Sequence, residues 1–175
     1  MTVIPDPYQR TVYHGRTVDQ RTKAALQVAE ARLGYDLTIV QGSYTTAVGQ
    51  SAGTHAGGGV VDLAPYQHAR KVKVLRDLGW AAWYRPKLPG VWGAHIHAVL
   101  IGHRTMSQSA AAQVVAYQHG LDGLAAGNTD PNPYRPNPPV VFDYRAAMRD
   151  TRIRARIRTL RSRIHALRDR ISYRP

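Results

Sequence analysis

Two stretches decide the fold of this 175-residue chain: Thr54-His55-Ala56-Gly57-Gly58-Gly59-Val60-Val61-Asp62 and Ala94-His95-Ile96-His97. On a β-strand, side chains two residues apart share a face, so His95 and His97 are predicted to point into one site. The three glycines that follow His55 permit a tight turn into the strand that ends near Asp62. Both segments can therefore bring polar side chains to the same point on a sheet.

Two His and one carboxylate make a three-ligand zinc site, which leaves one coordination position for water and is typical of catalytic zinc. The chain contains no cysteine, so disulfides, thiolate metal sites and cysteine nucleophiles are excluded. Imidazole and carboxylate groups are the remaining choice of ligand. We expect His55, Asp62 and His97 to bind Zn²⁺.

Hydrolysis of an amide by metal-bound water also needs a proton carrier. Glu30 is the single glutamate of the chain, and it is predicted to lie in the middle of a helix far from both segments. No Asp occurs within residues 78–121. His95 shares a face with His97 and can titrate near neutral pH, so it is the predicted carrier.

The rest of the sequence predicts an α+β domain with a small central antiparallel sheet and flanking helices. Apolar spacing indicates helices over residues 17–33, 66–78 and 107–119, with Thr17 or Asp19, and Ser107 or Ser109, as caps. Runs rich in β-branched and aromatic residues predict strands at 37–40, 59–63, 80–84 and 94–101. Gly34 is expected to end the first helix.

The composition changes after this region. Residues 120–139 are rich in Gly, Asn, Asp and Pro, which indicates a linker or a wrapped surface loop. Further on, apolar residues recur at intervals of 4, 3, 4, 3 and 4 on a helix that is otherwise mostly arginine: Ile153, Ile157, Leu160, Ile164, Leu167 and Ile171. We therefore divide the chain into a zinc-binding domain (1–127), a Pro-rich linker or wrapped loop (128–149) and a basic amphipathic helix (150–175).

Charge is concentrated in the last of these parts. Residues 150–175 hold nine Arg against two Asp and so supply +7 of the net charge of +13. Three roles fit this helix: packing on its own domain, self-association through the apolar stripe, or attachment to an anionic cell-envelope polymer or membrane surface. The start MTVIPDPYQR lacks the features of a secretory signal.

The spacing of the polar residues resembles a known family. His55 with Asp62 seven positions later, followed by His95-x-His97, is similar to the paired motif of the LAS zinc peptidases, which include VanY-like D-alanyl-D-alanine carboxypeptidases and phage L-alanyl-D-glutamate endopeptidases. The resemblance implies a LAS or hedgehog-like fold, zinc bound by His55, Asp62 and His97, and catalysis by His95. Many members carry an Arg where Gln41 or Ser43 stands here, and Gln41 is our candidate for the helper that polarises the carbonyl.

We therefore hypothesise that the chain is a zinc metallopeptidase that cleaves peptidoglycan stem peptides. It would be either a bacteriophage endolysin or a related actinobacterial enzyme. Such a protein would be made in the host cytoplasm and would act at the cell wall as a lysin or a virion-associated enzyme. One alternative is a catalytically silent wall-binding or structural module on the same fold. Another is a basic nucleic-acid-binding protein, which ranks lower because the domain contains no nucleic-acid-binding motif.

Overall fold

The computed structural model describes residues 3–47, 49 and 53–172, and it divides the chain into two compact units. One unit comprises Pro5–Phe142, and the other contains Val3, Ile4 and residues 143–172. The first unit carries every predicted site residue. It is an α+β domain, as the sequence predicts.

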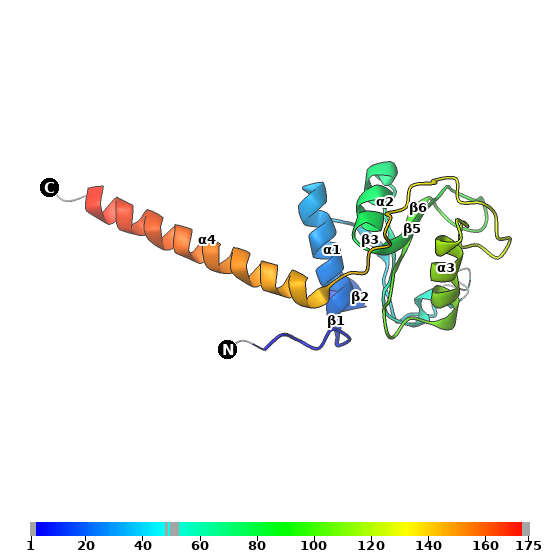
Figure 1. Cartoon of the computed structure of the whole chain (residues 1–175), viewed down its shortest axis with the longest axis horizontal. Helices are drawn as coiled ribbons and strands as arrows, with labels where there is room; N and C mark the ends of the chain where they lie inside the picture. Colours follow the sequence, from blue (N-terminus) through cyan, green and yellow to red (C-terminus); the bar gives the residue numbers. More distant parts are fainter. Residues whose placement is uncertain (1–2, 48, 50–52, 173–175) are drawn as a thin grey trace. The chain divides into compact units, whose positions relative to one another are not determined.

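A four-stranded antiparallel sheet organises this domain (Figure 1). Its strands are β3 (Ile39–Gln41), β4 (Val60–Leu63), β5 (Trp80–Arg85) and β6 (His95–Leu100), in the order β3-β4-β6-β5. Residues that lie directly opposite each other on neighbouring antiparallel strands share a face of the sheet. Trp83, His97, Asp62 and Gln41 form one such row across all four strands.

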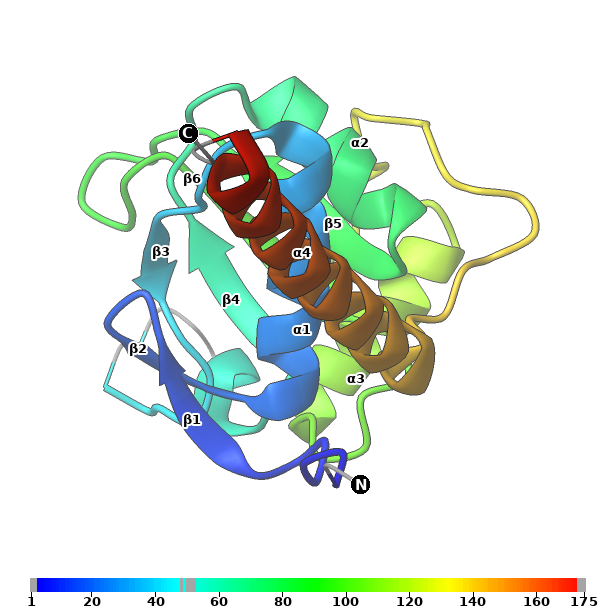
Figure 2. The same ribbon diagram turned by 90° about the vertical axis from the view of Figure 1, so that its left-hand side faces the viewer.

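Helices cover the two faces unequally. Figures 1 and 2 place α1 (Gln20–Leu33) and α2 (His68–Asp77) over one face of the sheet, and Figure 1 shows α3 (Gln108–Gln118) on the opposite face. α3 packs on a buried cluster that includes Val60, Val99 and Trp83. These side chains lie on the same face of the sheet as His97 and Asp62. Helix α3 therefore covers part of that face, and the uncovered part of the face borders a cleft.

A hairpin that our sequence analysis did not predict precedes α1. β1 (Arg10–Tyr13) and β2 (Arg16–Asp19) pair in antiparallel register through a turn at His14 and Gly15, both of which have positive φ. Thr17, which we considered as the start of the first helix, lies in β2. Asp19 is the N-cap, because its side chain accepts a hydrogen bond from the Thr22 N–H. Gly34 ends the helix in the left-handed conformation, as predicted.

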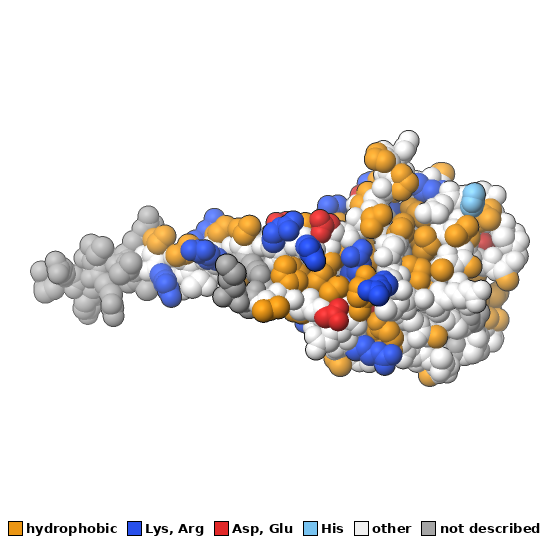
Figure 3. Space-filling model, turned by 60° about the horizontal axis from the view of Figure 1, so that its bottom comes forward, with side chains coloured by type: hydrophobic (Ala, Val, Ile, Leu, Met, Phe, Trp, Pro, Cys, Tyr) orange, Lys and Arg blue, Asp and Glu red, His pale blue; other side chains and the backbone are white. Residues whose placement is uncertain are grey.

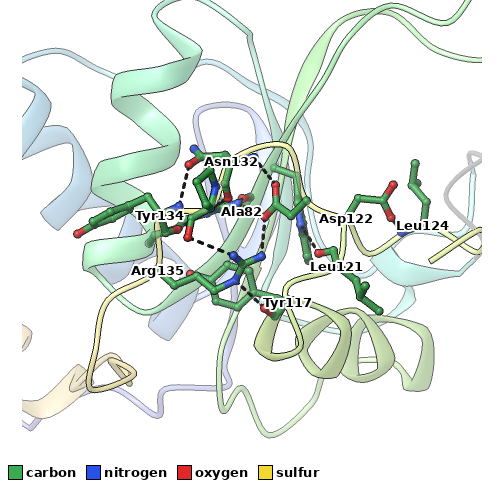
Figure 4. Close-up of polar contacts among 12 residues, drawn as sticks. Ala82, Tyr117, Leu121, Asp122, Leu124, Asn132, Tyr134 and Arg135 are labelled. Atoms are coloured by element: carbon green, nitrogen blue, oxygen red, sulfur yellow. Dashed lines mark hydrogen bonds and ion pairs between the residues drawn. The ribbon is translucent and has the colours of Figure 1, made fainter. Parts of the chain in front are cut away.

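The segment of residues 120–139 is wrapped onto the domain rather than extended away from it (Figure 4). We call it the wrapped segment. Arg76 of α2 donates a 2.6 Å hydrogen bond to the Asp130 carboxylate, and both side chains are almost fully buried. Arg76 also donates to the carbonyls of Asn132 and Tyr134. Arg135 of the segment donates to the same carboxylate and to the Tyr117 carbonyl of α3.

The second unit contains one long helix, α4 (Tyr144–Ser172). Ile153, Ile157, Leu160 and Ile164 are each at least 44% exposed, so the apolar stripe predicted from the sequence faces solvent in this chain. The side chains of Leu167 and Ile171 lie outside the described residues. Figure 3 shows blue Lys and Arg side chains beside orange hydrophobic ones along the helix. None of the described helices has both the length and the apolar character required to cross a bilayer.

Candidate metal centre

A short turn of 3-10 helix, η2 (Thr54–Ala56), places His55 beside the sheet, and the glycines that follow connect it to β4. The backbone here passes so close to its neighbours that only glycine fits. A Cβ on Gly57 would collide with the Thr105 carbonyl. Gly59 has a φ of +78°, and a Cβ on it would lie 2.6 Å from the His103 ring. The three glycines thus let the chain reverse direction within a packed environment.

The structure brings together the three predicted ligands. Oδ1 of Asp62 lies 2.8 Å from Nδ1 of His97 and 3.4 Å from Nε2 of His55. The three ligand atoms, one from each residue, all lie within 4.8 Å of one another, and all three side chains are buried. Asp62 and His97 are direct partners in the β4–β6 register, which accounts for their closeness.

The hydrogen bonds on the far side of each ring fix the tautomers. Nδ1 of His55 lies 2.7 Å from the Gly42 carbonyl, which can only accept, so Nδ1 carries the proton and Nε2 carries a lone pair. Nε2 of His97 lies 2.8 Å from Oε1 of Gln113. The Gln113 amide nitrogen donates to the Gly123 carbonyl, which orients its oxygen toward His97. His97 therefore carries its proton on Nε2 and a lone pair on Nδ1.

Three electron-rich atoms consequently face one another: Nε2 of His55, Nδ1 of His97 and Oδ1 of Asp62. Such atoms repel unless a proton or a cation lies between them. Burial raises the pKa of Asp62, but when the facing nitrogens of His55 and His97 are protonated, their hydrogen bonds and charge outweigh burial and hold that pKa well below its usual value. A cation in the same place would act in the same direction. Asp62 is ionised, as a metal ligand must be. This group could hold a metal ion, and its donors suit a divalent cation with a preference for N and O ligands.

Outer hydrogen bonds of this kind are typical of metal-binding histidines, whose second nitrogen is held by a carbonyl or a carboxylate. His55 has the Gly42 carbonyl, and His97 has the Gln113 amide oxygen. They fix both rings before any ion binds. The arrangement therefore costs little reorganisation on metal binding.

His95 lies next to this group. Its Nδ1 is held by the Gly93 carbonyl at 2.8 Å, so Nε2 carries a lone pair, and Nε2 lies 4.0 Å from Oδ1 of Asp62. The His95 side chain is 16% exposed, more than that of His55 or His97. His95 is thus an acceptor open to solvent at the edge of the cluster. This is the position that a proton carrier needs.

A cleft of about 830 Å³ opens over the cluster. It is lined by His55, Asp62, His95 and His97, and Gln41 and Tyr44 contribute to the same wall. Gln41 lies opposite Asp62 in the β3–β4 register. The Tyr44 hydroxyl donates a hydrogen bond to the Asp19 carboxylate. Burial, with the charge and hydrogen bond of Asp19, raises the pKa of Tyr44 to about 12.

Glu30, the single glutamate of the sequence, does not line the cleft, and its carboxylate is hydrogen-bonded within another part of the domain. Its carboxylate accepts hydrogen bonds from the Tyr13 hydroxyl and the Leu37 N–H, and it pairs with His14 at 2.7 Å. Among the described residues, Asp62 is the only acidic side chain that lines the cleft. His95 therefore remains the titratable group best placed to carry a proton.

Two residues of the site were missed in the sequence analysis. Gln113 is one of three glutamines on α3, and nothing in its spacing distinguishes it from Gln118. Arg85 lies two residues after Trp83, so strand parity could have put these two side chains on one face. Placing Arg85 next to His95 also needs the pairing of β5 with β6, and the predicted strand ended at residue 84. In the structure Arg85 lines the cleft and lies directly opposite His95.

Comparisons of the chain with models of protein families, with curated proteins and with solved structures found no match. The function therefore has to be inferred from the geometry of the cleft.

Proposed function

We propose that this protein is a zinc-dependent peptidase of the LAS type that acts on the stem peptides of peptidoglycan. The observation that carries the proposal is the fixed tautomer of His55 and His97, which turns two lone pairs toward the ionised Asp62 at the floor of an open cleft. Two imidazoles and one carboxylate are the ligands of many catalytic zinc sites. The resemblance of the His55, Asp62 and His95-x-His97 spacing to the LAS motif supplies the substrate class and the fold type.

A zinc ion bound by His55, Asp62 and His97 would supply an acidified water and a Lewis acid for the scissile carbonyl. His95 accepts a proton at Nε2 and returns it to the leaving amine, because its Nδ1 is held by the Gly93 carbonyl. Gln41 lines the same cleft and can donate its amide N–H to the carbonyl oxygen as charge develops there. The open cleft admits an extended peptide.

The proposal is tested by adding zinc to the metal-free protein and digesting purified peptidoglycan, with new termini identified by mass spectrometry. We expect one zinc per chain and the release of new amines. His97→Ala removes a ligand and should abolish both, whereas His119→Ala makes the same chemical change at an exposed position away from the cleft and should preserve both.

Each result has a defined meaning. If His97→Ala digests peptidoglycan at the wild-type rate, the proposed site is wrong. If the wild-type protein binds one zinc but releases no new termini, the silent wall-binding alternative holds instead. Tight DNA binding that survives chelation and weakens with salt would favour the nucleic-acid alternative.

A further inference from the structure

Arg85 is a buried cation on the wall of the cleft, and it has no anionic partner among the residues that the structure describes. The residue is 6% exposed. Its Nη2 donates to the backbone carbonyl of Asp122, and among the described residues no carboxylate oxygen lies within ion-pair distance of its guanidinium. By contrast, Arg76, which is also buried, is paired with Asp130. Burying a guanidinium without a counter-ion is costly, and residues that bear this cost cluster at binding sites.

The location of Arg85 shows where an anionic partner would sit. Arg85 lies directly opposite His95 in the β5–β6 register, on the same face as His97 and Asp62. Burial lowers the pKa of Arg85, and the negative charges of Asp122, Asp130 and Asp62 oppose this effect without forming a contact. The ring of Trp83 lies 5.2 Å from the guanidinium carbon and limits the directions from which a ligand can approach.

We infer that Arg85 binds a free α-carboxylate of the substrate, on the residue that supplies the amine of the scissile bond. This inference rests on the proposed function. A guanidinium offers two parallel N–H groups to a carboxylate, which fixes orientation as well as charge. With the carbonyl over the metal ligands and the carboxylate at Arg85, the amide nitrogen faces His95, which lies between the two.

The substrate class follows from this geometry. Hydrolysis adds water across the C–N bond: the hydroxyl goes to the carbonyl carbon, and the amine leaves with a proton. The leaving residue carries a free α-carboxylate when it is the C-terminal residue. A glutamate that continues the chain through its γ-carboxyl carries one as well. Arg85 thus selects for a carboxylate next to the leaving amine, and either of these two linkages provides it.

The test compares acids with their amides on the full-length zinc-loaded protein. The first pair of probes is diacetyl-L-Lys-D-Ala-D-Ala and its C-terminal amide. The second pair is L-Ala-γ-D-Glu-L-Lys and the form in which the glutamate α-carboxyl is amidated. We expect a preference of roughly tenfold to a hundredfold in kcat/KM for the acid of whichever pair is cleaved, as for a hydrogen bond between charged groups. The pair that shows cleavage identifies the linkage.

Arg85→Gln should remove most of this preference, while zinc stoichiometry stays at one per chain. Arg85→Lys retains the charge and should keep an intermediate preference, which provides a second readout if the Gln variant is unstable. A wild-type protein that treats acid and amide alike would overturn the inference. So would a preference that persists in Arg85→Gln, because a group other than Arg85 would then recognise the carboxylate.

A binding measurement distinguishes failure of the proposed peptidase function from failure of the inference about Arg85. If no probe is cleaved, the acid and amide of each pair are compared by calorimetric binding to the zinc-loaded protein. Stronger binding of the acid that is lost in Arg85→Gln supports the role of Arg85 even in a protein that cuts nothing. Equal binding of acid and amide contradicts it.

Discussion

Gln113 positions His97, one of the three candidate metal ligands. Its amide oxygen accepts from Nε2 of His97, and its amide nitrogen donates to the Gly123 carbonyl. This chain of bonds selects the His97 tautomer whose Nδ1 faces Asp62. Sequence analysis could predict His97 because strand parity and spacing are local, but Gln113 depends on how α3 docks on the sheet, which no local pattern encodes.

Replacement of Gln113 should weaken metal binding without unfolding the protein. We expect Gln113→Leu to lower zinc affinity by about tenfold to a hundredfold, since the outer partner that orients a ligating His contributes on that scale. Competition with a chromophoric chelator measures the change. Gln118→Leu, at an exposed position on the same helix, is the control. Equal zinc affinity in the two variants would show that the His97 ring is oriented by other contacts.

Asp19 predicts a pH dependence of stability. Burial raises the pKa of Asp19, but the close contact and charge of His103, whose Nε2 lies 2.9 Å from the carboxylate, and the hydrogen bond from the Thr22 N–H outweigh burial, so the net pKa is lowered. A carboxylate with a lowered pKa in the folded state adds stability above its unfolded pKa and loses it as pH falls through the folded value. Hydrogen bonds to a charged group contribute about 1.5–3 kcal/mol.

We therefore expect Asp19→Asn to be less stable than the wild-type protein at pH 5 to 6, and the difference in unfolding free energy to shrink below about pH 4. Urea denaturation in the presence of a chelator, repeated between pH 2.5 and 6, measures this difference. A difference that stays constant over the whole range would mean that the lowered pKa of Asp19 contributes nothing.

At the scale of elements, local signals predicted the sheet strands and the helices but not how distant segments are joined. The β1–β2 hairpin was missed although His14-Gly15 is a plausible two-residue turn between β-prone residues. The wrapped segment was expected to be a linker or a surface loop, and composition alone could not choose between them. The segment is held on the domain by the hydrogen bond between Arg76 and Asp130, which lie 54 positions apart in the sequence.

Breaking this buried pair should destabilise the domain. Among the described residues, Arg76→Ala leaves the Asp130 carboxylate with Arg135 as its one cationic partner. It also frees the carbonyls of Ala82, Asn132 and Tyr134. Loss of one member of a buried pair costs about 3–5 kcal/mol. Arg70→Ala removes the same side chain at an exposed position of α2 and should leave the midpoint of urea unfolding nearly unchanged. Similar midpoints for both variants would contradict this role of Arg76.

On the scale of the whole molecule, the chain joins a domain with a cleft to a separate unit dominated by a basic helix. The exposed stripe of α4, flanked by arginines, suits an anionic surface, in keeping with the proposed site of action at the cell envelope. Self-association through the same stripe is the competing role. The sequence predicted the stripe and its charge because both are periodic and local, but a partner leaves no such pattern.

Removal of residues 143–175 should weaken binding to anionic surfaces and leave zinc binding intact. We expect the shortened protein to bind zinc as the full chain does, since the ligands and their outer partners all lie within residues 5–142. Its binding to phosphatidylglycerol vesicles should fall by tenfold or more, because each basic residue near an anionic surface contributes on the order of 1 kcal/mol. Phosphatidylcholine vesicles are the control. If the full chain sediments as a dimer and ignores both vesicles, α4 is an association helix instead.

Three successive carbonyls of the wrapped segment each hold a side chain of the cleft region. Leu121 accepts from the Trp83 indole, Asp122 from Arg85 and Gly123 from Gln113. The tripeptide does this with its main chain, so these three bonds tolerate a change of the Leu121 side chain. They do not tolerate a change of length: deleting one residue would shift all three acceptors by one place and misalign the indole, the guanidinium and the amide together. An engineer should therefore leave the spacing of this loop untouched.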